Sequence, residues 1–168
     1  TLLFIALAGS MALLPLIIPR QPTKNNAAQS TNNSTIESRP KVIKTFPQAY
    51  QTDVSPDLDQ ISVTFDQPMM NLSWSWVGGG ETFPQKTGEP RYDKTKTTCT
   101  IPVTLEPGKF YWIGSNSPKF TYFQTDLHTP ALPYVIVFAT KDQNGQPGSI
   151  PDNYREEARS VNSLHLTD

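Results

Sequence analysis

The residues Leu-Glu-Pro-Gly-Lys-Phe-Tyr at positions 105–111 carry the sharpest structural signal in this chain. Their Leu-x-Pro-Gly-x-x-Tyr pattern fits a tyrosine corner, in which a tyrosine at the start of a β-strand bonds its hydroxyl to backbone a few residues upstream. Pro107 presets φ for the turn, and Gly108 accepts a positive φ. We therefore expect Leu105 and Tyr111 to be buried against a facing sheet. An ordinary hairpin turn is the alternative interpretation.

Short β-prone runs extend in both directions from this turn. Apolar and polar residues alternate over residues 61–65 and 99–103, so each run places one face on a core and the other in water. The other β-prone runs occupy residues 42–43, 74–77, 110–113 and 134–139. Turn residues separate the runs, and no convincing helix lies between them. This spacing predicts an all-β fold, an antiparallel β-sandwich of about seven strands over residues 41–140.

Particular stretches of residues 41–140 match a known type of domain. The most specific stretch is ISVTFDQPM at residues 61–69, supported by TFP at 45–47, TDVSPDL at 52–58, the 105–111 turn and VFAT at 137–140. Together they resemble the bacterial Ig-like domains of the S-layer type (SbsA-type Ig-like domains), although residues 78–97 match only loosely. The resemblance implies an immunoglobulin-like β-sandwich from an exported protein, serving as a spacer, a surface module or an attachment to an enzyme. It implies no catalytic residues.

The chain begins with an apolar segment. Residues 2–18 contain no charged side chain, and their length is close to the ~20 residues that span a bilayer. We interpret residues 1–18 as a retained transmembrane anchor. A cleaved signal segment is the alternative, although cutting after Ala8 would leave a strongly apolar new N-terminus. The product would be membrane-anchored in the first case and secreted in the second.

Polar segments lie on both sides of the predicted sandwich. Residues 19–40 contain Ile36 as their only large aliphatic side chain, so we expect a flexible polar linker. Residues 141–168 read as a polar tail with a possible short helix. Asp152 would cap this helix, which either docks weakly on the sandwich or frays.

Composition argues against several kinds of chemistry. The net charge of -1 provides no basic field, so nucleic acid is not an expected partner. Cys99 is the single cysteine, which excludes an intrachain disulfide and a thiolate zinc site. Its place in an alternating strand makes it a core residue, and neither His128 nor His165 lies near a nucleophile motif. We expect no catalytic residue, no bound metal and no cofactor, and hence no enzyme.

Aromatic side chains are the candidate ligand contacts. Two tryptophans share one face of the β-prone run 74–77, where one would serve as the core tryptophan and the other could stack on a sugar ring. Three further aromatics lie in the long connection 116–133, and long loops at the end of a sandwich often carry binding residues. The candidates are Trp74, Trp76, Phe120, Tyr122 and Phe123. Core packing is the alternative for all of them.

These features predict a non-catalytic, extracytoplasmic Ig-like structural or interaction module in the cell envelope. The N-terminal segment would tether it to the membrane, and other envelope proteins or glycans would be its partners. Arg20 and Lys24 follow the apolar segment, and the positive-inside rule would place these two cations in the cytoplasm. The resemblance to exported domains instead places the folded residues from Lys41 onward outside the cytoplasm. The alternatives are a carbohydrate- or cell-wall-binding module and an accessory domain of an exported hydrolase.

Overall fold

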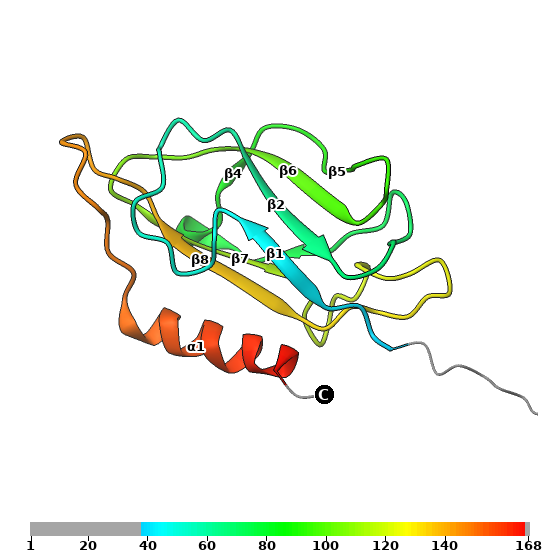
Figure 1. Ribbon diagram of the computed structural model, residues 1–168. Helices are drawn as coiled ribbons and strands as arrows, with labels where there is room; N and C mark the ends of the chain where they lie inside the picture. The colour runs from blue at the N-terminus through cyan, green and yellow to red at the C-terminus, as the bar shows by residue number, and fades with distance from the viewer. Residues whose placement is uncertain (1–37, 167–168) are drawn as a thin grey trace, which may run out of the picture. The chain divides into compact units, whose positions relative to one another are not determined.

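Two antiparallel β-sheets face each other in residues 38–166, the part of the chain that the computed structural model describes (Figure 1). The first sheet contains β1 (Val42–Phe46), β2 (Gln60–Phe65), β4 (Gln85–Lys86), β5 (Arg91–Tyr92) and β6 (Thr98–Thr104). The second contains β3 (Trp76–Val77), β7 (Phe110–Ser115) and β8 (Tyr134–Ala139). The strand orders are β1-β2-β6-β4, with β5 also paired to β6, and β3-β7-β8.

Side chains from both sheets form the core between them. Ile61 on β2 lies opposite Ile101 on β6, and both belong to one buried cluster with Tyr111, Ile113 and Phe138 of the second sheet. Each fully buried aliphatic side chain contributes about 1.5–3 kcal/mol relative to an exposed one. On β2 and β6 every second side chain is buried, which confirms the alternation predicted for residues 61–65 and 99–103.

The chain segment after β1 crosses to the second sheet and bonds to the edge of β8. The N–H of Tyr50 donates to the carbonyl of Val137 at 2.6 Å, and the N–H of Ala139 donates to the carbonyl of Gln51 at 2.8 Å. Val54 then forms a parallel bridge with Thr140. These bonds satisfy part of the edge that β8 would otherwise leave open.

One α-helix covers the outer face of the second sheet. Helix α1 (Asp152–Asn162) is followed by the short 3-10 turn η2 (Ser163–His165), and it lies along β8 in Figure 1. Its buried Ala158 packs with Val137 and Ala139, and the rings of Phe110 and Tyr154 lie 4.9 Å apart. The helix predicted in the tail is thus docked on the sheet.

The structure corrects two predicted details at the domain boundaries. Asp152 is the first helical residue and not the cap, because Pro151 occupies the N-cap position and no side chain caps the helix. Residues 38–40, predicted as linker, belong to the fold: the Arg39 guanidinium donates to the carbonyls of Pro130 and Ala131, both at 3.0 Å.

No helix within residues 38–166 is long and apolar enough to cross a membrane. The predicted anchor, residues 1–18, and the linker up to residue 37 lie outside the described residues.

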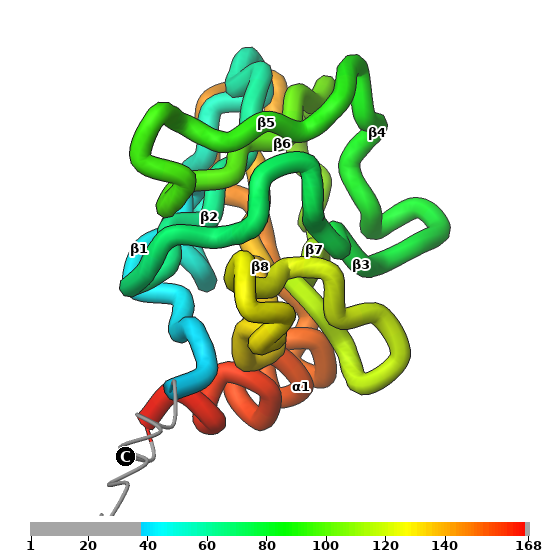
Figure 2. Tube along the Cα trace, turned by 90° about the vertical axis from the view of Figure 1, so that its right-hand side faces the viewer, coloured from blue at the N-terminus to red at the C-terminus, as the bar shows by residue number. Residues whose placement is uncertain are grey.

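The short strands β3 and β4 run along the same side of the molecule, as the end-on view in Figure 2 shows. Each is the last strand of its sheet. The connection between them contains the 3-10 turn η1 (Gly80–Thr82). This arrangement leaves the two sheet edges facing each other across the core, and the candidate site lies between them.

Candidate functional site

The 105–111 turn has the bonds predicted for a tyrosine corner. The backbone N–H of Glu106 donates to the hydroxyl of Tyr111 at 2.7 Å, and Gly108 has a φ of 71°. Tyr111 is 1% exposed and stacks on Phe138 at a centroid distance of 5.3 Å. Burial raises the pKa of Tyr111, so its hydroxyl keeps its proton at neutral pH. Leu105 is also buried, and these residues serve the fold.

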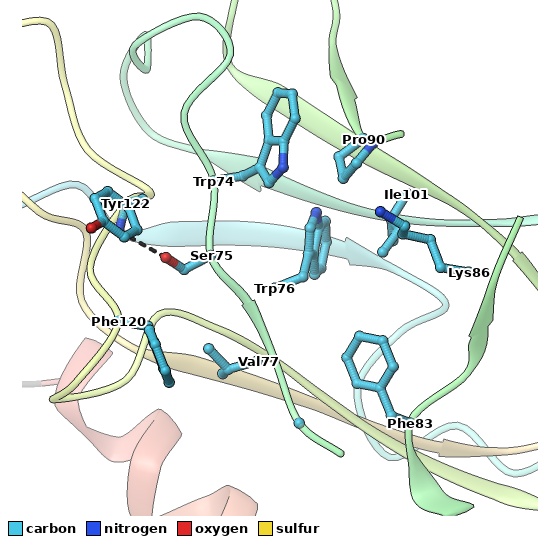
Figure 3. A pocket seen from close by; sticks show the side chains of 11 residues that line it. Trp74, Ser75, Trp76, Val77, Phe83, Lys86, Pro90, Ile101, Phe120 and Tyr122 are labelled. Atoms are coloured by element: carbon cyan, nitrogen blue, oxygen red, sulfur yellow. Dashed lines mark hydrogen bonds between the residues drawn. The ribbon is translucent and has the colours of Figure 1, made fainter. Parts of the chain in front are cut away.

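A pocket of about 530 Å³ lies between β3 and β4 (Figure 3). We call it the side pocket. Most of its lining is aromatic or apolar, from Trp74, Trp76, Phe83, Pro90, Phe120 and Tyr122. Ile101, a core residue of β6, also lines it, so the pocket reaches inward between the two sheets. Four of the five predicted aromatic candidates therefore meet at one place.

Trp76 forms the inner wall of the side pocket. Its ring meets that of Phe123 edge-on, with centroids 5.3 Å apart, and it packs against the buried cluster that contains Cys99. Burial raises the pKa of the Cys99 thiol to about 12, against a smaller lowering by the Trp76 indole. The thiol is therefore protonated and unreactive. Trp76 packs against both buried clusters between the sheets, whereas Trp74 packs against one of them.

Trp74 lies nearer the mouth of the pocket. Its ring centroid is 6.3 Å from that of Tyr92, whose hydroxyl donates to the Ser73 carbonyl at 2.9 Å. Burial raises the pKa of Tyr92 above its usual value, so the phenol remains a neutral donor. The pair fixes the Trp74 indole beside Pro90 while leaving it partly exposed (Figure 3). A fixed, partly exposed indole suits stacking on a ligand.

The connection 116–133 supplies the facing rim of the pocket. Tyr122 is 61% exposed and Phe120 is 48% exposed. The N–H of Tyr122 donates to the Ser75 hydroxyl at 2.9 Å, the dashed line in Figure 3, and the Ser73 hydroxyl donates to the Tyr122 carbonyl at 2.5 Å. The two serines thus hold the rim on the β3 segment.

Phe123 does not belong to the site, contrary to its selection as a candidate contact. It is 0% exposed, and its ring lies 5.2 Å from that of Phe65 and 5.3 Å from that of Trp76. The adjacent Tyr122 is 61% exposed, so these two neighbouring aromatic side chains have opposite environments.

The buried side chain of Asn116 organises this connection, and the sequence analysis did not identify it. Its amide nitrogen donates to the carbonyls of Phe123 and Ala131, at 2.9 and 3.1 Å. Its amide oxygen accepts from the N–H of Phe123 at 2.9 Å. Asn116 has a φ of 61°, a conformation that asparagine tolerates better than most residues. An asparagine three residues after the β-prone run 110–113 was the available signal.

Two further residues shape the floor and the polar edge of the pocket. A Cβ atom on Gly78 would lie 2.5 Å from the ring of Phe83, so glycine lets that ring close the floor. Lys86, which lines the pocket, forms an ion pair of 2.8 Å with Glu89. The pocket therefore combines ring surfaces with one cationic side chain, whose partner Glu89 lies outside the lining.

The side pocket is suited to binding by contact and stacking. Its lining contains no His, Cys, Asp or Glu. Within residues 38–166, no three such residues lie close enough together to hold a metal ion. Exposed aromatic surface and a concave apolar lining are features of ligand sites that hold rings or apolar groups.

No family model and no curated protein matches this chain. Among solved structures, the crystal structure of the S-layer protein rSbsC(31-844) is similar, with 18% sequence identity and a TM-score of 0.39. The similarity covers 62% of this chain and 14% of that chain.

Proposed function

We propose that the chain is a non-catalytic, extracytoplasmic Ig-like interaction module, tethered to the membrane by residues 1–18. In this proposal the side pocket receives an apolar or ring-shaped group of a partner in the cell envelope. The observation that carries it is the aromatic pocket between β3 and β4, with Trp74 and Tyr122 both partly open to solvent.

The strand order supports the Ig-like assignment. An immunoglobulin constant-type domain has strands A-B-E-D in one sheet and C-F-G in the other. The orders β1-β2-β6-β4 and β3-β7-β8 correspond to these two sheets. Tyr111 lies near the start of β7, the strand equivalent to F, and Trp76 lies on β3, the strand equivalent to C. Both positions are hallmarks of that fold.

The rigidity of the rim supports a binding role. Trp74 is held by Tyr92, and the backbone of Tyr122 is held by Ser73 and Ser75. Aromatic side chains that are already fixed lose little conformational entropy on binding. The same rings supply a large contact area, as anchor residues at interfaces do.

Site-specific photocrosslinking in intact cells tests this role. A benzoylphenylalanine placed at Tyr122 should crosslink a defined envelope component on irradiation. The matched control is the same residue at Asn144, an exposed turn position far along the chain from the pocket. Crosslinks at position 122 that match those at position 144 would contradict the proposal. Added protease should digest the domain in spheroplasts, and protection would contradict the extracytoplasmic placement.

A carbohydrate- or cell-wall-binding module is the second candidate. The polar side chains of Lys86 and Ser75 in the lining favour it, because a sugar needs both a ring surface to stack on and polar groups for its hydroxyls. Added glycans should then quench the intrinsic tryptophan fluorescence, and Trp74→Ala should abolish the change. An unchanged signal over a broad glycan and muropeptide panel would remove this candidate.

A further inference from the structure

Exposed leucines gather at one end of the described structure. Among residues 38–166, eight large apolar side chains are exposed, and four of them are leucines. They are Leu72 at 78%, Leu127 at 75%, Leu164 at 46% and Leu166 at 84% exposure. They come from three separate parts of the chain: the β2–β3 connection, the β7–β8 connection and the segment after α1.

Strand directions and hydrogen bonds place these three parts together. β1 and β8 begin at this end, where β2 and β7 finish, as the antiparallel registers require. The N–H of Met70 donates to the Gln124 carbonyl at 2.7 Å, and His165 bonds to the Pro133 carbonyl at 2.9 Å. Arg39 bonds to the carbonyl of Pro130. The described chain therefore starts at the same end, which we call the tether end and which faces the viewer in Figure 2.

Charges differ between the two ends of the sandwich. The tether end carries the cations Arg39, Lys41, Lys94, Lys96 and Lys119, and the anions Asp66, Asp93 and Asp126. At the opposite end, the connections carry the anions Asp53, Asp57, Asp59, Glu106 and Asp142, and the cations Lys109 and Lys141. An anionic surface would thus repel the opposite end and accept the tether end.

We propose that the tether end docks on the surface of an anionic lipid bilayer, with its leucines in the headgroup region. The inference rests on the membrane-tethered part of the proposed function. Apolar side chains interspersed with basic ones are the features by which proteins bind the interface of anionic membranes. Exposed apolar side chains concentrated on one surface also mark interaction sites in general.

The chain's own arrangement favours a bilayer as the occupant. In the proposed function the apolar residues 1–18 anchor the chain, and nineteen mostly polar residues separate them from Ser38. A tether of this length keeps the end that carries Ser38 at a high effective concentration near the membrane. The rim residues Trp74, Phe120 and Tyr122 come from the same two connections as Leu72 and Leu127, so in this orientation the side pocket lies close to the membrane surface.

Spin labels on the full chain in vesicles test the docking. A nitroxide is attached at Leu127→Cys or, as the control on the opposite end, at Asn144→Cys. The buried Cys99 is not labelled in the native protein. In vesicles of phosphatidylethanolamine and phosphatidylglycerol, the label at 127 should gain contact with oxygen and lose contact with a water-soluble nickel complex. The label at 144 should show neither change.

Variants and flotation separate the docking from the tether. Leu72→Ser in the Leu127→Cys chain should lower the ratio of docked to undocked molecules roughly tenfold. High salt should lower the same ratio, and so should vesicles made of phosphatidylcholine alone. If the chain floats with vesicles but label 127 remains in water, or becomes immobile without gaining oxygen contact, the docking proposal fails and the tether stands. If the chain does not float with vesicles, both proposals fail.

Discussion

The backbone N–H of Glu106 donates to the hydroxyl oxygen of Tyr111 across a distance of 2.7 Å. This bond joins the turn between β6 and β7 to a ring that is 1% exposed and stacked on Phe138. Thr140 continues the connection, because its hydroxyl donates to the Glu106 carbonyl at 2.6 Å. The turn is thereby tied to β7 and to the end of β8, both in the second sheet.

Tyr111→Phe should therefore destabilise the fold. The substitution keeps the ring but removes the acceptor of the Glu106 N–H, at a cost of about 1–2 kcal/mol in the free energy of unfolding. Urea denaturation followed by circular dichroism measures the change. Tyr122→Phe, at a hydroxyl-bearing ring that is 61% exposed, is the control and should leave the midpoint unchanged. Equal midpoints for both variants would show that the bond contributes nothing.

Asn162 holds the end of helix α1 to the edge of β8. Its amide oxygen accepts from the Val135 N–H at 2.7 Å, and its amide nitrogen donates to the Val135 carbonyl at 2.9 Å. Asn162→Ala should cost about 1–3 kcal/mol, because two backbone groups lose their partner. Hydrogen exchange of the α1 amides should accelerate. Asn153→Ala, an exposed position on the same helix, should not change it, and protection retained in N162A would contradict this role.

His165 should make stability depend on pH. Burial lowers its pKa, with Lys41 and Arg39 acting in the same direction and the Pro133 carbonyl and Asp66 opposing. As the pH falls, the histidine of the unfolded chain, with a pKa of ~6.5, therefore binds a proton before the histidine of the native protein does. The free energy of unfolding should decrease below about pH 6.5, until the native histidine is protonated as well. Between about pH 7 and pH 5, the urea midpoint of His165→Gln should fall less steeply than that of the unsubstituted protein. Parallel pH profiles of the two proteins would contradict this.

The Cys99 thiol should be inert in the native protein. It is buried, and burial raises its pKa to about 12, so almost no thiolate exists at neutral pH. A chromogenic disulfide reagent should react with one thiol per chain only after urea is added. Rapid reaction of the native protein would mean that this part of the core opens readily.

Local patterns predicted the features that depend on neighbouring residues. Alternation identified the inward faces of β2 and β6, because a strand places every second side chain on the same side. The Pro107-Gly108 turn and Tyr111 were identifiable for the same reason, since the bond from Glu106 spans only five residues.

Contacts distant in sequence could not be read in this way. The burial of Phe123 depends on Phe65 and Trp76, and the docking of α1 depends on Asn162 bonding to Val135. The sequence offered aromatic side chains in the long connection, but nothing local distinguishes the buried Phe123 from the exposed Tyr122. The position of the side pocket likewise follows from how the edges β3 and β4 meet across the two sheets.

The central claim is that the side pocket is the binding surface, and the three tryptophans of the chain can test it directly. Trp74 and Trp76 line the pocket, whereas Trp112 packs beneath helix α1. Fluorine NMR of the chain labelled with 5-fluorotryptophan, assigned by single Trp→Phe variants, reports on all three. On addition of muropeptides or of the crosslinked envelope partner, the resonances of Trp74 and Trp76 should shift while that of Trp112 stays in place. A ligand that binds and shifts only Trp112, or none of the three, would contradict the account.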